Sequence, residues 1–276
     1  MSIKKYRPTT PGRRDGSISK NKNLKKPSEK SLLRPLKKKG GRSSSGRRTV
    51  RGRGGGAKRK YRCVDFKRNK HNVSATVKAL EYDPNRTSWI ALIEYEDGEK
   101  AYMIAPQRLQ EGDQVVSGKE VSLSVGNRLP LKEIPSGTQV YNLEFNPGQG
   151  GKIVRSAGSS AQILAHEGDY VHIKLPSKEI RKFNKRCYAT IGQVSNPRHR
   201  FEKLGKAGRK RHKGRRPKVR GTAMGAHDHP HGGGEGRTGA GRPTKTKWGK
   251  PAHGAKTRKK NKQSDKFIIE RRPKNK

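Results

Sequence analysis

The sequence predicts a mainly β protein in which two small barrels form the folded middle and long basic extensions flank them. The charge is unevenly spread, because residues 1–60 hold 22 basic and 2 acidic residues and residues 196–276 hold 27 and 5. Residues 61–195 hold 19 and 15, the balance of an ordinary globular domain. Short apolar runs separated by turn residues recur through this middle part, without a convincing long helix between them.

The first group of predicted strands begins after the basic N-terminal extension. Asp97 and Gly98 separate two short apolar runs, and an Asp-Gly pair in that position is a strong signal for a β-hairpin. Asp83-Pro84-Asn85 has the composition of a turn. The strands expected in this group are residues 61–66, 73–82, 89–95, 100–104 and 121–125.

A second group of predicted strands begins near Leu129, with turn residues at 167–169 and 176–177. About 135 residues in many short strands are more than one small barrel needs, so we expect two barrels joined near residues 126–135. The strands expected in this group are residues 139–145, 151–155, 161–166, 170–175, 179–183 and 189–194.

The two extensions contain little apolar surface. Residues 40–48 and 51–56 consist mostly of Gly, Ser and Arg and cannot bury enough apolar area to offset the entropy of ordering. We therefore expect the extensions to be disordered alone and ordered on nucleic acid, apart from a short helical turn within residues 203–211. The predicted divisions are residues 1–59, 60–125, 126–196 and 197–276.

The net charge of +46 points to a polyanionic partner, because the self-repulsion of so many cations opposes a compact fold. Nucleic acid fits, since each Lys or Arg that displaces a counterion from a phosphate gains entropy. A membrane is not expected, because the longest apolar stretches, such as residues 89–93, are too short to span a bilayer. The opening residues precede no apolar signal segment. Cys63 and Cys187 form no CxxC motif and fit a reducing compartment.

Structured RNA is the expected nucleic acid. The sequence contains no helix-turn-helix pattern, no zinc-finger spacing and no basic region followed by heptads. Aromatic residues make up 5% of the chain, which argues against a platform that stacks single-stranded bases. The remaining mode is recognition of the phosphates and the shape of a folded RNA. The alternative classes are a DNA-compacting protein, whose affinity would be indifferent to RNA fold, and a histidine-dependent metal enzyme.

Basic side chains alternate with core residues where the N-terminal extension meets the first strand, so one face can meet phosphate while the other packs. The alternative to RNA binding is that these side chains form a strand face exposed only to solvent. Arg86 follows a turn and Arg155 precedes an open Ser-Ala-Gly-Ser-Ser loop, positions at which an arginine is usually just solvated. The residues predicted to contact RNA are Arg48, Lys58, Lys60, Arg62, Lys67, Arg68, Lys70, Arg86, Arg155, Arg211, Lys213, Arg216, Arg220, His229, His231 and Arg237.

The loop at residues 227–237 contains three histidines and a glycine run. On a strand, His227, His229 and His231 would share one face and could hold Zn²⁺. Pro230 and the glycines argue against a regular strand, and no second ligand group accompanies them. His229 could in principle act as a general base, but no nucleophile motif accompanies it. We favour a loop whose amides and imidazoles bind RNA phosphates and 2′-hydroxyls, with no catalytic and no metal-binding residue.

Several motifs, in order along nearly the whole chain, resemble those of a known family. Residues 220–224 and 228–237 resemble the signature of the universal large-subunit ribosomal protein L-two family, in its bacterial or organellar form. The sequence departs from the usual bacterial pattern at residues 225–227. Further matching motifs are Val64-Asp-Phe-Lys-Arg-Asn-Lys70, Leu80-Glu-Tyr-Asp-Pro-Asn-Arg86, Arg155-Ser-Ala-Gly158, Leu204-Gly-Lys-Ala-Gly208 and Asp265-Lys-Phe-Ile-Ile269.

The resemblance implies a mainly β fold in which an OB-fold barrel precedes an SH3-like barrel, with basic extensions. It implies a non-enzymatic structural protein that binds large-subunit rRNA and supports subunit assembly, subunit association and the architecture near the peptidyl transferase centre. Arg86 and Arg155 match arginines associated with rRNA binding, and His229 matches a histidine linked to peptidyl transfer. The implied partners are rRNA, neighbouring large-subunit proteins and the small subunit, on a ribosome in the cytoplasm or an organelle. The protein itself needs no cofactor, although Mg²⁺ can accompany bound rRNA.

Overall fold

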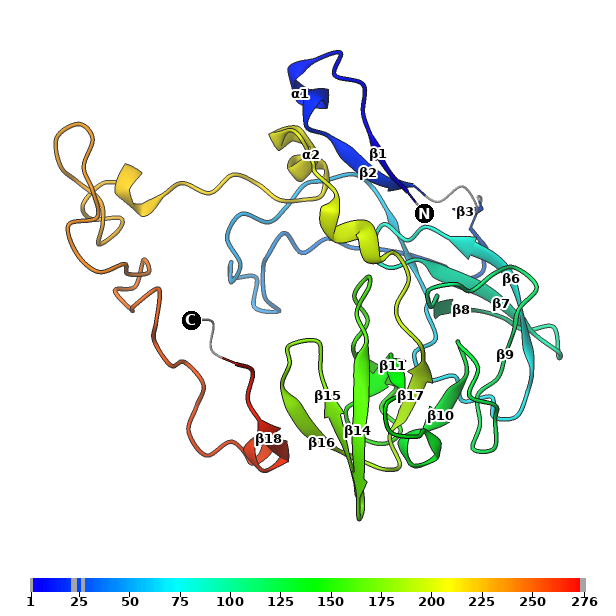
Figure 1. Ribbon diagram of the computed structural model, residues 1–276. Helices are drawn as coiled ribbons and strands as arrows, with labels where there is room; N and C mark the ends of the chain where they lie inside the picture. The colour runs from blue at the N-terminus through cyan, green and yellow to red at the C-terminus, as the bar shows by residue number, and fades with distance from the viewer. Residues whose placement is uncertain (1, 21–23, 26–27, 274–276) are drawn as a thin grey trace. The chain divides into compact units, whose positions relative to one another are not determined.

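A computed structural model describes residues 2–20, 24–25 and 28–273 (Figure 1). The chain forms two compact units. The first contains residues 1–37, 58–207 and 264–276, and the second contains residues 38–57 and 208–263. The first unit is mainly β, which confirms the predicted fold class. Over the described ranges, no helix has the length and apolar character needed to cross a membrane.

The first curled sheet of the first unit corresponds to the expected OB-fold barrel. The predicted hairpin is confirmed, because β7 and β8 pair in antiparallel register on either side of Gly98, whose φ is +82°. β6 pairs with β7 on one edge and carries β9 on the other, and β3 adds a short parallel pairing to β6. The strands are β3 (Leu24–Lys25), β6 (Ala75–Glu81), β7 (Ile90–Tyr95), β8 (Lys100–Ile104) and β9 (Gln114–Val115).

The strand predicted at residues 121–125 is wrong. This segment is a loop, and the strand that completes the sheet is β9, which precedes it. The loop is shaped by Asn127, whose side chain donates to the carbonyl of Ser122 at 3.0 Å and accepts from the amide of Val116 at 2.8 Å. Leu123 and Val125 are exposed, so their apolar character marks no buried strand face.

The second sheet corresponds to the SH3-like barrel, and its order is β10-β17-β11-β14-β15-β16-β18. β14, β15 and β16 form a long antiparallel meander (Figure 1). The single strand expected at residues 139–145 divides at Asn142, whose φ of +48° turns the chain out of the first ladder. The strands of this sheet are β10 (Arg128–Pro130), β11 (Gln139–Tyr141), β14 (Ala161–Glu167), β15 (Tyr170–Lys174), β16 (Ile180–Asn184), β17 (Tyr188–Ile191) and β18 (Ile268–Glu270), with η1 at Leu131–Glu133. β12 (Leu143–Glu144) and β13 (Gly151–Ile153) pair with each other in a separate two-stranded sheet.

The two sheets share apolar packing because β7 and β8 are buried on both faces. Ala91 and Met103 pack inside the first sheet, whereas Ile90 and Tyr102 join the core of the second. Side chains in a strand point alternately to opposite faces, so a strand buried on both sides contributes to two cores. β7 and β8 therefore contribute side chains to both apolar cores.

Parts of both extensions pair with the barrels, which departs from the expectation that they lack structure. Leu24 and Leu32 pack against the two cores, and β18 extends the second sheet along β16. These few apolar residues provide the burial that the basic composition conceals. The remaining elements are β1 (Ser2–Lys5), α1 (Pro11–Arg14), β2 (Ser17–Lys20), β4 (Leu33–Pro35), β5 (Lys60–Arg62), η2 (Pro197–Phe201) and η4 (Gln263–Phe267).

The second unit consists of turns, isolated bridges and short helices. α2 (Ala207–His212) provides the helical turn expected within residues 203–211. η3 (Gly221–Ala223) opens the histidine loop. Backbone bridges join Arg42 to Arg48 and Arg53 to Arg215.

Candidate nucleic-acid interface

Arg86 and Arg155 converge on the ring of Phe66 in the first unit. The guanidinium carbon of Arg86 lies 5.5 Å from the ring centroid, and that of Arg155 lies 4.5 Å from it. The Nε of Arg86 donates to the buried carboxylate of Asp83 at 2.6 Å. Arg155 donates from Nη1 to the carbonyl of Gly151 at 3.1 Å. Two arginines from different barrels are therefore held in fixed orientations at one aromatic ring.

The electrostatics of this cluster favour an anion. Partial burial and then the nearby charge of Arg86 lower the pKa of Arg155 below its ordinary value. Two like charges held together repel each other, and a phosphate between or beside them relieves that repulsion. Planar guanidinium groups match phosphate oxygens in a two-pronged geometry, so the pair suits an RNA backbone. Phe66 belongs to the predicted basic stretch, but its contribution was missed because an apolar residue there indicates core.

Arg68 is buried, contrary to the expectation that its side chain faces outward. Its Nη1 donates to the carbonyl of Gly126 at 2.6 Å. Two residues after Gly126, Arg128 forms a buried ion pair with Glu144, with 2.9 Å between Nη2 and Oε1. Burial, the largest cause, lowers the pKa of Arg128 to about 10 despite this carboxylate. Arg68 therefore has a structural environment, because the chain bends at residues 66–67 and Arg68, with a φ of +48°, lies outside any regular strand.

Other members of the predicted basic stretch differ in how freely they can meet a phosphate. Lys70 pairs with Asp97 and Glu99 at the β7–β8 hairpin, and these carboxylates raise its pKa. Arg62 donates to Ser28 Oγ and to the carbonyl of Lys60, each at 3.2 Å. The side chains that the structure leaves exposed are those of Arg48, Lys58, Lys60, Lys67, Arg211, Lys213, Arg216, Arg220 and Arg237.

His231 holds the histidine loop together from inside. It is 9% exposed, its Nε2 accepts from the amide of Lys245 at 2.7 Å, and its Nδ1 lies 3.2 Å from the carbonyl of Ala240. A nitrogen that accepts from an amide carries no proton, so the neutral ring is protonated at Nδ1 and donates to Ala240. Both ring nitrogens of His231 are hydrogen-bonded within the protein, so the side chain acts as a brace that joins the loop to residues 240 and 245. The sequence instead predicts an RNA contact for His231.

His229 stacks on this brace. Its ring centroid lies 5.2 Å from that of His231, and its Nδ1 accepts from the amide of His231 at 3.1 Å. The proton of the neutral ring is then on Nε2, which is the atom that can donate to a phosphate or 2′-hydroxyl. Of the two predicted histidines, His229 therefore has the geometry of a ligand contact.

The glycines of this loop are required by packing against the chain itself. A Cβ on Gly232 would stand 2.2 Å from the carbonyl oxygen of Gly225, and one on Gly221 would stand 2.4 Å from the ring of His229. Such approaches exclude any side chain at these positions. The glycine run thus shapes the loop through internal contacts.

The histidines of the loop bear on the alternative of a metal site. Within the described ranges, no three His, Cys, Asp or Glu side chains are grouped in a way that could hold a metal ion. His227 contacts the neighbouring Asp228 at 3.4 Å and is largely exposed.

Comparisons with known proteins identify the family. Residues 29–117 match the family model described as Ribosomal Proteins L2, RNA binding N-terminal domain, and residues 124–249 match Ribosomal Proteins L2, C-terminal domain. The chain is also 55% identical, over 273 residues, to the large ribosomal subunit protein uL2 of Phenylobacterium zucineum (strain HLK1). That alignment covers 99% of this chain and 98% of the relative. The chain therefore belongs to the ribosomal protein L2 family.

Proposed function

We propose that this chain is a structural constituent of the large ribosomal subunit and that it binds large-subunit rRNA. The observation that carries the proposal is the family match along almost the whole chain, with an N-terminal domain described as RNA-binding. The geometry supports it, because Arg86 and Arg155 form a cationic site on a rigid β support. The mechanism is neutralisation of phosphates by basic side chains whose register the barrels fix.

The proposed role is non-catalytic. The Nε2 proton that we assign to His229 suits hydrogen bonding to RNA, and the loop geometry that supports His229 is built by His231. We therefore propose that His229 maintains RNA geometry near the peptidyl transferase centre and carries out no chemical step. We also propose that the chain contacts neighbouring large-subunit proteins and the small subunit, and that Mg²⁺ accompanies the bound rRNA.

Crosslinking in cells tests this function. The full-length chain carrying an affinity tag is crosslinked to RNA by ultraviolet light and purified under denaturing conditions, and the attached RNA is sequenced. We expect the crosslinks to concentrate in one region of large-subunit rRNA, with peptides near Arg86, Arg155 and His229 among those attached. Crosslinks spread over messenger RNA, or a chain recovered mainly on DNA, would favour a general nucleic-acid-binding protein and contradict the proposal.

A further inference from the structure

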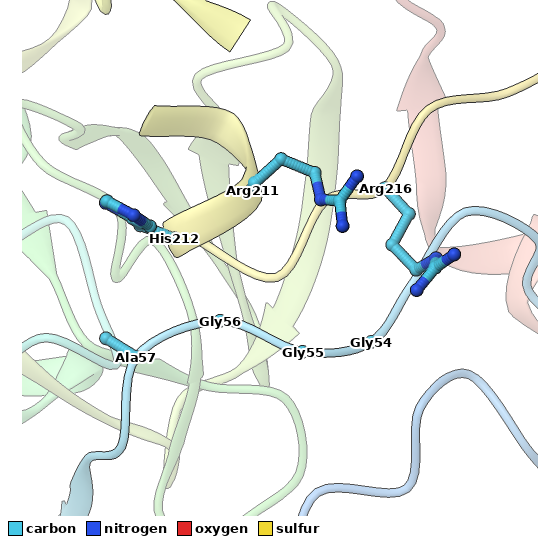
Figure 2. A pocket seen from close by; sticks show the side chains of 7 residues that line it. All are labelled: Gly54, Gly55, Gly56, Ala57, Arg211, His212 and Arg216. Carbon is cyan, nitrogen blue, oxygen red and sulfur yellow. The ribbon is translucent and has the colours of Figure 1, made fainter. Parts of the chain in front are cut away.

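A cavity of about 480 Å³ lies within the second unit. The glycine-rich segment at residues 54–57 lines one side, and Arg211, His212 and Arg216 line the other. Figure 2 shows Arg211 extending toward Arg216 on the same side of the glycine backbone. The cavity therefore places two guanidinium groups beside a stretch of bare main chain.

The charge around this cavity is positive, without a carboxylate in its lining. The second unit contains 25 Lys and Arg residues, and its acidic residues are Asp228 and Glu235, both outside the cavity. Cations gathered in this way oppose one another unless an anion joins them. Its volume can hold a phosphate group with part of its sugar, and the guanidinium groups of Arg211 and Arg216 are the lining side chains that can match phosphate oxygens.

Lys38 removes the main obstacle to an anion in this place. Its Nζ donates to the carbonyl oxygens of Gly55, Gly56 and Ala57 at 3.3, 2.8 and 2.8 Å. Carbonyl oxygens left facing the cavity would repel a phosphate, whereas an ammonium group bound to three of them offsets their negative charge. Lys38 thus fixes the glycine-rich segment and offsets the negative charge of its carbonyl oxygens.

The last turn of α2 presents a similar obstacle, which the backbone removes. The carbonyl of Arg209 accepts from the amide of Lys213 at 3.2 Å, and that of Arg211 accepts from Gly214 at 2.9 Å. The carbonyl of His212 accepts from the amide of Ala57 at 2.9 Å, and this hydrogen bond joins the helix to the glycine-rich segment. These bonds engage acceptors that a helix C-terminus otherwise directs at its surroundings.

Glycine is required at the closest contact of the two segments. At Gly56 the φ is +85°, and a Cβ would stand 2.8 Å from both the amide of Gly214 and the carbonyl oxygen of His212. Gly55 also has a positive φ, of +62°, but a Cβ there would meet open space. Gly56 is therefore required where the two segments meet, whereas Gly55 has open space around it.

We propose that this cavity binds a phosphodiester of the rRNA backbone, with Arg211 and Arg216 contacting the phosphate oxygens and Lys38 acting as a positioning residue. The proposal rests on the proposed function and adds a specific site to it. It separates residues that otherwise look equivalent, because Lys39 and Arg215 carry the same charges next to Lys38 and Arg216 but do not line or build the cavity.

Matched substitutions in the full-length chain test the site. Lys38→Met is compared with Lys39→Met, and Arg216→Gln with Arg215→Gln, by measuring affinity for transcribed large-subunit rRNA at fixed salt. We expect Lys38→Met and Arg216→Gln each to weaken binding about tenfold, as loss of a charge-assisted contact does. Each neighbour removes one distant charge and should change affinity by less than about threefold. Equal losses within both pairs would overturn the cavity as a specific site.

A footprint of individual phosphates provides the second readout. Phosphorothioate-substituted rRNA is cleaved with iodine in the presence of each variant, so protected phosphates are identified one by one. Arg216→Gln should lose protection at one or two adjacent phosphates that Arg215→Gln retains. If Lys38→Met perturbs folding, the arginine pair still decides the question, since both arginines are exposed.

Free phosphate and the RNA backbone share the chemistry that the cavity recognises, and competition separates them. Inorganic phosphate at matched ionic strength should displace the footprint no better than sulfate if the site is built for the RNA backbone. Specific displacement by inorganic phosphate would instead identify a free-ion site and overturn the assignment to rRNA. If the unmodified chain shows no preference for large-subunit rRNA, the proposed function itself fails. If that preference holds while the matched pairs behave alike, only the cavity proposal fails.

Discussion

Arg68 and His231 are both polar side chains that the sequence pattern assigns to RNA, and both are buried. Arg68 donates to a backbone carbonyl within the first unit, and His231 joins two parts of its own loop. Phe66 packs against the core, as an apolar residue is expected to do, and it also lies beside two arginines. At the scale of single residues, composition indicates the class of partner, while local packing decides which side chains can reach it.

Replacing His231 tests the brace. His231→Ala removes the acceptor for the amide of Lys245, and we expect hydrogen exchange at that amide to accelerate about fivefold or more, in line with the loss of about 1 kcal/mol. His227→Ala is the control, because the side chain of His227 is 87% exposed and lies 3.4 Å from its neighbour Asp228. Equal exchange rates at Lys245 in both variants would show that the ring of His231 does not hold the loop.

Replacing Arg86 or Arg155 tests the cluster at Phe66. Arg86→Gln and Arg155→Gln each remove one of two cations that share a ring, and we expect each to weaken rRNA binding about tenfold. Each should also reduce the steepness of the salt dependence by about one unit. Arg181→Gln is the matched control, since Arg181 lies 4.5 Å from the ring of Phe145, and among the residues that the structure describes no second arginine is seen at that ring. The assignment fails if the control weakens binding as much as the two tested variants.

At the scale of elements, β10 and β12 are joined by the buried ion pair of Arg128 and Glu144. Glu144 also accepts from the amides of Gly150 and Tyr188, each at 3.0 Å, so one carboxylate connects three segments of the second barrel. Removing it leaves a buried guanidinium without its counter-charge, which is more costly than losing an exposed pair.

Glu144→Ala should therefore lower the free energy of unfolding by about 3–5 kcal/mol. Glu133→Ala is the control, because its pair with Lys132 is solvent-accessible and should contribute at most about 1 kcal/mol. Urea unfolding monitored by tryptophan fluorescence and circular dichroism measures both variants. Similar stability in the two would show that the buried pair does not join these strands.

Sequence patterns identified most strands because turn residues mark their ends, and the Asp97-Gly98 hairpin is confirmed. Two errors have local causes. The segment at residues 121–125 alternates like a strand but is held as a loop by the side chain of Asn127, and Asn142 divides another strand through its positive φ. The short pairings of β3 and β18 were not expected, since two or three apolar residues within a basic extension give no periodic signal.

At the scale of the whole molecule, the division into a balanced middle and strongly basic flanks is visible in the sequence, and it indicates a polyanionic partner. The family motifs add Arg86, Arg155 and His229. What the sequence does not contain is the spatial grouping of these residues: the ring shared by two arginines, the tautomer of His231 and the cavity built by Lys38 all arise from residues distant along the chain. Such contacts follow only from the fold.

The most direct test of phosphate recognition on a folded RNA is the affinity for large-subunit rRNA as a function of salt, in the presence of excess duplex DNA. If about ten phosphates are contacted, affinity should fall by about three to five decades between about 50 and 200 mM salt. Over that range the preference for rRNA should persist. An affinity that barely changes with salt, or a chain that DNA displaces as readily as rRNA does, would contradict the account.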